Sequence, residues 1–245
     1  MSFIDVENVG KVYRASAGGP ETRVLEGVSF SIVEGEFVAL MGPSGSGKTT
    51  LLMVVGAMNR PTEGRVAVDG IDVYALSEER RADFRREYLG FVFQQHHLMP
   101  YLSAVENVML PLATVRRPAR AKRELALAAL EKVGLASKAA RLPSQLSGGE
   151  QGRLAIARAV VNEPPLLLAD EPTGALDTRT GGEVLNVLLD LNARGQTVLL
   201  VTHNPETAAP AGRVLHLLDG RRSGETVGLF TRTTTYRQAL ITEER

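Results

Sequence analysis

Apolar and polar positions alternate in the N-terminal part of the chain, which is the pattern of a sheet with one buried face. The alternation runs through residues 2–13, where Ile4 and Val6 fall on the same side. Strand character resumes over residues 24–33, and residues 65–73 read as two strands joined by an Asp-Gly turn, which is a hairpin signal. The pattern therefore predicts an N-terminal antiparallel β part.

Longer apolar runs come next, and they alternate with segments of helical spacing. The apolar runs are residues 36–41, 89–94, 166–171 and 197–201, and the helix-compatible segments are residues 49–55, 78–87, 151–161 and 178–191. Strands that alternate with helices predict an α/β fold with a parallel sheet. In such a sheet, binding sites lie beyond the carboxyl ends of the strands.

One stretch of the chain has helical spacing without any strand signal. Residues 104–115 and 120–133 carry apolar side chains at helical intervals, with Leu127 and Leu130 in the second segment. This predicts a helical lobe, at about residues 95–162, inserted between two strands of the core.

Composition narrows the classes of protein that the chain can belong to. With 245 residues and 44% hydrophobic content it can form one large domain, or a domain with a lobe. The formal net charge is zero, so a nucleic-acid partner is not expected. The chain has no cysteine, which excludes disulfides and thiolate metal sites and fits a reducing compartment. We expect no direct membrane span, because no apolar run approaches the ~20 residues that a bilayer requires.

A glycine-rich loop stands between the first apolar run and the first helix. It consists of Gly42, Pro43, Ser44, Gly45, Ser46, Gly47, Lys48, Thr49 and Thr50, and it matches the phosphate-binding pattern G-x-x-x-x-G-K-[ST]. Glycines let backbone N–H groups approach a triphosphate, Lys48 would add positive charge over the β- and γ-phosphates, and the Thr49 hydroxyl would hold Mg²⁺. A glycine- and serine-rich surface loop is the alternative, but the flanking strand and helix favour a nucleoside triphosphate site.

Polar side chains follow other apolar runs directly. Asp170 ends one run and is predicted to hold Mg²⁺, while the next residue, Glu171, would orient or deprotonate water. His203 follows another run and could donate a hydrogen bond to the γ-phosphate, and Gln94 ends a third. The alternatives are an acidic loop start for the carboxylates and a structural role for the histidine.

A second anion-binding segment precedes the helix that begins near residue 151. Ser147, Gly148 and Gly149 would expose backbone N–H groups at a helix start, but no lysine accompanies them. Since the chain already has one complete phosphate cradle, we expect this segment to serve a nucleotide held by another copy of the chain. A glycine helix cap is the alternative.

The order of these motifs resembles that of ATP-binding cassette (ABC) transporter ATPase subunits over about residues 2–220. The matching segments are 42–49, 93–94, 146–151, 168–172, 175–177 and 201–203. The resemblance implies ATP and Mg²⁺ as ligands and a head-to-tail homodimer in which Ser147 and Gly149 reach the partner's γ-phosphate. It assigns Gly148 and Glu150 to the same nucleotide-binding segment. It also implies adenine stacking for Tyr13, metal and water sensing for Gln94, and a cross-dimer role for Asp177.

The sequences of residues 143–151 and 170–177 are similar to those of the lipoprotein-release and macrolide-export subfamily. This implies an ATPase subunit at the cytoplasmic face of the cell membrane that powers an integral membrane permease and exports or extracts a lipophilic or peptide substrate. The alternative is a non-transport ABC ATPase that regulates a cell-division or cell-envelope complex. A kinase or GTPase would share the phosphate loop but would not need the segment 146–151.

Two features depart from the family pattern. Gly152 stands where the family usually has glutamine or arginine, and an interior glycine costs a helix about 0.5–1 kcal/mol relative to alanine. We therefore expect a looser start to that helix. We also divide the chain into an ABC ATPase domain at 1–220 and a polar C-terminal extension at 221–245, which exceeds what the resemblance needs.

Overall fold

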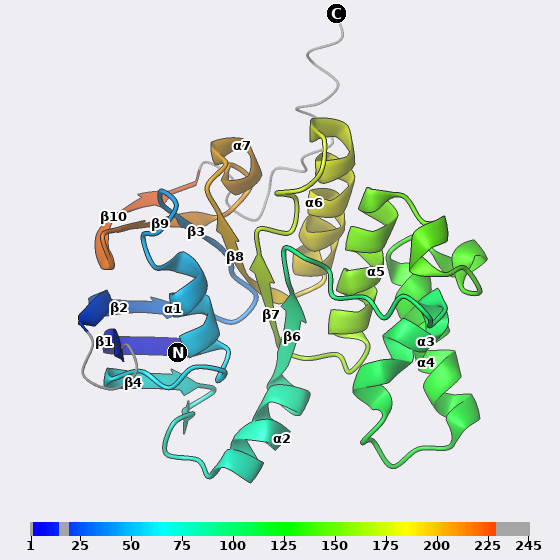
Figure 1. Cartoon of the computed structure of the whole chain (residues 1–245), viewed down its shortest axis with the longest axis horizontal. Coiled ribbons are helices and arrows are strands. Elements are labelled where there is room, and N and C mark those ends of the chain that lie inside the picture. Colours follow the sequence, from blue (N-terminus) through cyan, green and yellow to red (C-terminus); the bar gives the residue numbers. More distant parts are fainter. Residues whose placement is uncertain (1, 15–19, 229–245) are drawn as a thin grey trace, which may run out of the picture.

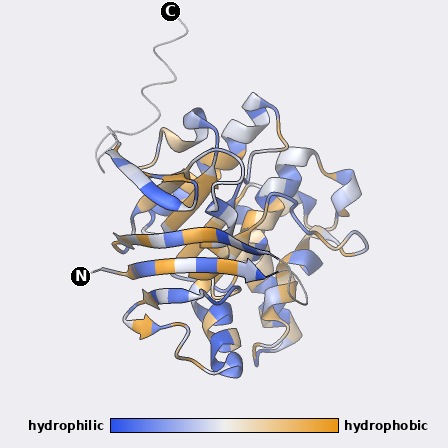
Figure 2. Cartoon of the chain, turned by 60° about the vertical axis from the view of Figure 1, so that its left-hand side comes forward, coloured by the Kyte–Doolittle hydropathy of each residue, from blue (hydrophilic) through white to orange (hydrophobic). Residues whose placement is uncertain are grey.

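A computed structural model describes residues 2–14 and 20–228 of the chain. Its N-terminal sheet is antiparallel and has the strand order β2-β1-β4-β5. The strands are β1 (Ile4–Arg14), β2 (Glu21–Ile32), β4 (Glu63–Val68) and β5 (Ile71–Asp72). Figure 2 shows hydrophobic and hydrophilic residues alternating along the long strands of this sheet. The predicted hairpin is present, with positive φ angles of 51° at Asp69 and 73° at Gly70 in its turn.

The second sheet has six strands in the order β10-β9-β3-β8-β7-β6. The strands are β3 (Phe37–Met41), β6 (Leu89–Val92), β7 (Leu166–Asp170), β8 (Thr197–Thr202), β9 (Arg213–Leu218) and β10 (Arg221–Val227). All neighbouring pairs are parallel except β9 and β10. Every residue of β7 and β8 is buried, as expected for strands covered on both faces. The predicted parallel sheet is confirmed.

The strand β10 differs from the sequence expectation, which assigned residues 221–227 to an extension. It pairs antiparallel with β9 through a turn at Asp219 and Gly220, whose φ angles are 46° and 75°. Its residues are mostly exposed and polar, so no hydrophobic pattern marks it as a strand. The domain therefore continues past the predicted boundary at 220, and residues 229–245 of the proposed extension lie outside the described part.

Helices separate and cover the two sheets (Figure 1). Helix α1 (Lys48–Val55) lies between them, and one core joins its buried leucines and valines to strands of both sheets. A second core joins the other face of the parallel sheet to α5 (Gly148–Val160) and α6 (Thr178–Ala193). Two further helices are α2 (Glu78–Tyr88), which precedes β6, and α7 (Pro205–Ala208), which follows β8.

Helical elements fill the segment between β6 and β7, and no strand interrupts them. They are α3 (Ala104–Met109), η1 (Leu110–Leu112), α4 (Ala119–Lys132), η2 (Ala136–Lys138), η3 (Pro143–Gln145) and α5. The predicted helix over residues 104–115 is too long. It changes to a 3₁₀ turn at Leu110 because Pro111 in a helix interior would clash with the carbonyl of Asn107. Among the residues described, no helix combines the length and the apolar character needed to cross a bilayer.

A fully buried asparagine fixes the loop that leads into this lobe. The Asn107 side chain accepts a hydrogen bond from the Met99 N–H at 2.8 Å. Its amide donates to the carbonyls of Met99, Leu102 and Ser103 at 3.1, 2.9 and 3.1 Å. One polar side chain thus satisfies the backbone of the turn at residues 99–103.

We predict that Asn107→Ala lowers the free energy of unfolding by about 3 kcal/mol, because it leaves several buried backbone groups without partners. Denaturant unfolding measures this loss. Asn162→Ala is the matched control, since the Asn162 amide makes a single long bond of 3.4 Å to the Pro111 carbonyl, and its loss should stay below about 1 kcal/mol. Equal losses in the two variants would contradict the assignment.

Candidate active site

The glycine-rich loop joins β3 to α1 and lies against neighbouring backbone. Its turns need positive φ angles of 81° at Gly45 and 98° at Gly47, which favour glycine. A Cβ at position 42 would lie 2.1 Å from the Leu217 carbonyl oxygen, so only glycine fits there as well. The loop consequently directs the N-terminus of α1, with its partial positive charge, toward the space above it.

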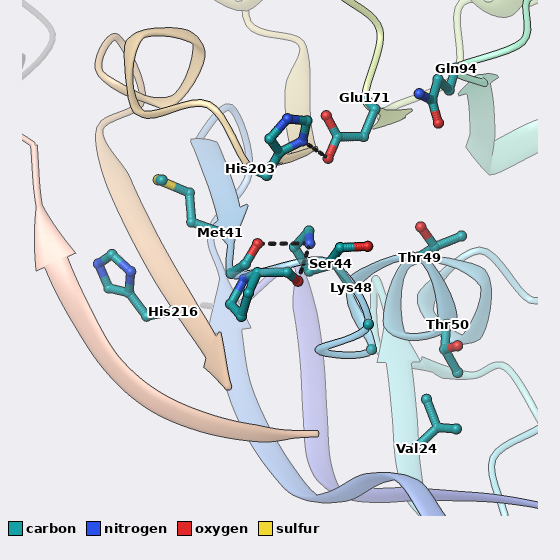
Figure 3. A pocket seen from close by; sticks show the side chains of 14 residues that line it. Val24, Met41, Ser44, Lys48, Thr49, Thr50, Gln94, Glu171, His203 and His216 are labelled. Carbon is teal, nitrogen blue, oxygen red and sulfur yellow. Dashed lines mark hydrogen bonds and ion pairs between the residues drawn. The ribbon is translucent and has the colours of Figure 1, made fainter. Parts of the chain in front are cut away.

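The side chains of the loop fit a polyanionic ligand. The Lys48 ammonium is buried and donates to the carbonyls of Gly42 and Pro43, each at 2.8 Å, so it spans the loop (Figure 3). The hydroxyl of Ser46 is buried without a hydrogen-bond partner among the described residues. A buried donor without a partner and a buried cation beside several N–H groups are the features expected of a phosphate cradle.

A hydroxyl and a carboxylate meet next to this loop. The Thr49 hydroxyl donates to the Asp170 carboxylate at 3.1 Å, from the start of α1 to the end of β7. Burial raises the pKa of Asp170, and the negative charge of Glu171 raises it further, while Thr49 and Lys48 oppose the shift. Mg²⁺ typically takes one or two protein carboxylates and completes its shell with phosphate and water oxygens. The pair fits such an ion, and the described residues hold no group of three or more His, Cys, Asp and Glu side chains that could bind a metal without a phosphate ligand.

The second acid pairs with the predicted histidine. The Glu171 carboxylate lies 2.7 Å from Nδ1 of His203, across the ends of the adjacent strands β7 and β8 (Figure 3). The Glu171 N–H donates to the Val201 carbonyl at 2.9 Å, and its φ of 47° is unusual for a residue other than glycine. Such backbone strain costs about 1–3 kcal/mol and is common at functional sites. The histidine therefore orients a carboxylate that faces the loop.

Gln94 completes the site from the far side. It follows β6, and its amide nitrogen lies 3.3 Å from the place that a Cβ on Gly174 would occupy. The site is a pocket of about 730 Å³. It is lined by Val24, Met41, Gly42, Pro43, Ser44, Gly45, Gly47, Lys48, Thr49, Thr50, Gln94, Glu171, His203 and His216.

Three of these lining residues did not follow from the sequence. Val24 reaches the pocket from β2, and Met41 and His216 reach it from β3 and β9. His216 is held by a contact of 3.0 Å between Nε2 and the Thr226 hydroxyl. The only sequence signal was its place near the carboxyl end of a strand, and β9 lies beside β3 in the sheet.

Other predicted residues lie outside this pocket. Ser147 caps α5: its hydroxyl accepts from the Glu150 N–H at 3.3 Å, and the Glu150 carboxylate accepts from the Ser147 N–H at 2.9 Å. A hydrogen bond from Lys138 lowers the pKa of Glu150. Asp177 caps α6 by accepting from the Thr180 N–H at 3.0 Å, and this bond lowers its pKa.

The glycines of the α5 cap also have a packing role. A Cβ on Gly149 would lie 2.2 Å from Cγ2 of Thr180 in α6, and one on Gly148 would lie 3.0 Å from the Leu176 side chain. The N-terminal ends of α5 and α6 can therefore approach this closely only with glycine at position 149. This packing accounts for the glycines without excluding nucleotide contact.

Tyr13 lies on β1 with 42% of its surface exposed, and it is not among the residues that line the pocket. Its hydroxyl accepts a hydrogen bond from Asn59, and the Lys11 ammonium lies 5.0 Å from the ring centroid. The ring is accessible, and its stacking on adenine stays a prediction.

The fold and the site together define a class of protein. A phosphate loop between a parallel strand and a helix, a threonine-aspartate pair beside it, and a carboxylate held by a histidine are the parts of a phosphate-loop nucleoside triphosphatase. The family comparison makes this specific: the ABC transporter family model matches residues 25–174, and the chain belongs to that family. The predicted ABC ATPase is thereby confirmed.

Named relatives include the macrolide export ATP-binding/permease protein MacB of Burkholderia pseudomallei (strain 1710b), 46% identical over 212 residues. That match covers 86% of this chain and 32% of MacB, so the chain spans about a third of the length of that relative. An uncharacterized ABC transporter ATP-binding protein of Thermotoga maritima is 44% identical, with 90% of this chain and 94% of the relative covered. YknY of Bacillus subtilis, of the same description, is 46% identical, with coverages of 89% and 94%.

Solved structures share the fold. The cassette MJ0796, in a dimeric post-hydrolysis state bound to ADP and Pi, has a TM-score of 0.84 and 42% identity. That match covers 93% of this chain and all of the other. CbiO1 from Clostridium perfringens, part of the transporter complex cbiONQ, has a TM-score of 0.81 and 28% identity, with coverages of 92% and 88%. The predicted phosphate-loop fold with a parallel sheet is confirmed.

We predict that Glu171→Gln keeps ATP binding but lowers the rate of hydrolysis by about 10²–10⁴, because the amide keeps the shape of the side chain and loses its basicity. Equilibrium binding of ATP and single-turnover hydrolysis separate the two effects. Glu206→Gln is a matched control, because Glu206 lies in α7 outside the pocket. Wild-type turnover in Glu171→Gln would show that the base lies elsewhere.

Proposed function

We propose that this chain is the ATP-hydrolysing subunit of a membrane exporter, and that two copies clamp two ATP molecules head to tail. The observation that carries the proposal is the division of the predicted site into two surfaces. One surface is the phosphate-loop pocket, and the other is the α5 N-terminus with Ser147, which contributes nothing to the lining of that pocket.

The second surface suits a phosphate from another chain. Ser147 and Gly148 are exposed at the N-terminus of a helix that is long enough to have a useful dipole. Such a terminus stabilises an anion, but its own chain brings no phosphate loop to it, and the lysine nearby, Lys138, is paired with Glu150. A second copy placed head to tail would bring its own nucleotide to this terminus. The dimeric state of MJ0796 with ADP and Pi supports this arrangement.

Within each composite site, the chain's own groups divide the work. Mg²⁺, when bound, would neutralise charge on the phosphates, and Thr49, Asp170 and Gln94 are the residues that would hold it. Lys48 and the loop N–H groups would bind the β- and γ-phosphate oxygens. Glu171 would accept a proton from the attacking water while His203 keeps its carboxylate oriented.

The names of the relatives support the proposed permease and substrate class. MacB is named as a macrolide export ATP-binding/permease protein, which supports export of a lipophilic or peptide substrate through an integral membrane permease. The chain would then work at the cytoplasmic face of the membrane, held there by that permease. Regulation of a cell-division or cell-envelope complex is the second candidate, and the two share the same ATPase site.

A groove next to the helical lobe offers a surface for the permease. It has a volume of about 490 Å³ and lies between α2 and β6 on one side and η1 and α5 on the other. Two exposed apolar side chains line it, Met58 and Leu110, which are 46% and 40% exposed. Met99 and Tyr101, which are 45% and 91% exposed, lie in the loop before α3 and do not line the groove. Leu98 is half-buried and packs against the core of the lobe, and Leu102 is also half-buried.

The shared-site proposal predicts that mixing two inactive variants restores activity. Lys48→Ala removes the cation of the phosphate cradle, and Ser147→Arg should clash with the partner's phosphate, so each homodimer should be inactive. In a mixed dimer, one composite site collects both lesions and the other has an intact Lys48 and an intact Ser147. ATPase activity should therefore appear only when both variants are present.

A binding assay covers the case in which two working sites are needed for turnover. With Glu171→Gln added to both chains, the mixed dimer should retain one tightly held ATP. No retained ATP after verified mixing would contradict the shared site.

The groove proposal predicts that Met58→Glu and Leu110→Glu weaken co-purification with the permease about tenfold or more, since each places a charge in an apolar contact. Basal ATP hydrolysis should stay unchanged. Val227→Glu is the matched control, because this exposed apolar residue lies on β10, away from the groove. A full yield of complex in both groove variants would place the contact elsewhere.

A further inference from the structure

The segment that follows Gln94 is fastened to α5 by an arginine. Arg158, in the last turn of α5, donates to the His96 carbonyl at 2.5 Å and to the His97 carbonyl at 2.6 Å. A planar guanidinium that bonds two successive carbonyls fixes both the position and the direction of the backbone. The Phe93 and His97 rings contact edge to face, with centroids 5.3 Å apart, which further limits this segment.

A second contact joins the same segment to the other end of α5. The His96 side chain reaches the position where Gly152 has no side chain. A Cβ on Gly152 would lie 3.4 Å from Nε2 of His96 and 3.1 Å from Cγ2 of Val184 in α6. Gly152 is buried, so a long side chain at this position could not turn to solvent without moving one of these neighbours.

We propose that Gly152 forms a seat for the His96 imidazole, and that His96 is a positioning residue that holds Gln94 in register with α5. The proposal gives a reason for the glycine where the family usually has glutamine or arginine. The sequence predicts a looser start to this helix. In the structure, however, Gly152 is packed on two sides, by His96 and Val184.

The contact between His96 and Gly152 lies close to Gln94 on one side and to Ser147 on the other. His96 is two residues from Gln94, and a chain spans at most about 3.5 Å per residue, so a fixed His96 confines the Gln94 side chain. Gly152 is five residues from Ser147, about 7.5 Å along the helix at 1.5 Å per residue. A shift of the α5 N-terminus would therefore reach Gln94 through one side-chain contact and the Arg158 fork.

The competing explanation is that Gly152 only permits α5 to pack on Val184. The two explanations differ in one respect: a seat makes the effect of a change at 152 depend on the residue at 96. A double-mutant cycle measures this dependence. Gly152→Gln should displace the imidazole, and His96→Ala should remove it.

We expect each single variant to lower kcat about fivefold with little change in the Kd for ATP, a typical size for residues in contact. The double variant should lose about the same fivefold, because the second change removes a contact that is already lost. Independent effects would multiply to about 25-fold, and that result would overturn the proposal.

Hydrogen exchange of the backbone provides a readout apart from activity. Amides of residues 94–98 should exchange faster in Gly152→Gln and in His96→Ala, to the same extent, and no faster in the double variant. Gly182→Gln is the matched control: this helical glycine in α6 has open space around its Cβ position, so exchange and kcat should both stay as in the wild type.

Two outcomes count against the seat. Unchanged exchange at 94–98 in Gly152→Gln would show that the imidazole is not displaced, and equal effects of Gly182→Gln would show a general response to glutamine in these helices. If Gly152→Gln fails to fold, the shorter Gly152→Asn takes its place in the same cycle, because its Cβ would already contact His96 and Val184, at 3.4 and 3.1 Å, and the amide beyond it needs further room. The losses in kcat are then expected to be smaller, but the two single losses must still fail to multiply in the double variant.

Discussion

The close approach of the phosphate loop to the backbone around it is the constraint on which the rest of the structure depends. A Cβ on Gly42 would meet the Leu217 carbonyl, and one on Gly47 would lie 2.8 Å from the Val24 carbonyl. The Gly220 N–H donates to the Ser46 carbonyl at 3.1 Å. The loop thus touches the antiparallel sheet and the parallel sheet together, and α1 fills the space between them. The position of the loop determines where side chains must lie to bind the same ligand. These side chains are Thr49, Asp170, Glu171 and His203.

Much of the fold and of the site could be predicted because the residues that define them lie in short contiguous segments of the sequence. The phosphate loop, Asp170, Glu171 and His203 each follow an apolar run, and parallel strands bring their carboxyl ends to one edge. Val24 and His216 were not found, since they reach the pocket from strands whose order in the sheets no local pattern reveals. The end of the predicted helix at 115 was wrong because Pro111 outweighed the apolar spacing.

The chain does not bring all the predicted nucleotide-site residues to one pocket. The residues around Lys48 form a pocket, whereas Ser147 and Asp177 cap helices α5 and α6, whose N-terminal ends pack closely at Gly149 and Thr180. Sequence motifs identified both the phosphate-loop residues and the two helix caps, but the spacing of the motifs along the chain does not show how far apart they lie in space. That separation follows from the helical lobe, which carries α5 away from the loop in this chain.

The polar strand β10 has a consequence for how copies of the chain can meet. It is an edge of the six-stranded sheet, and an edge strand can recruit a strand from another molecule. Here the edge carries Arg221, Arg222 and Glu225, and these are already paired: Arg221 with Glu26, and Glu225 with Arg222 and Arg213. A strand from another molecule that paired with β10 would disturb these ion pairs and would bury little apolar surface. This edge of the sheet is therefore protected against edge-to-edge polymerisation, so a contact between copies of the chain is directed to other surfaces.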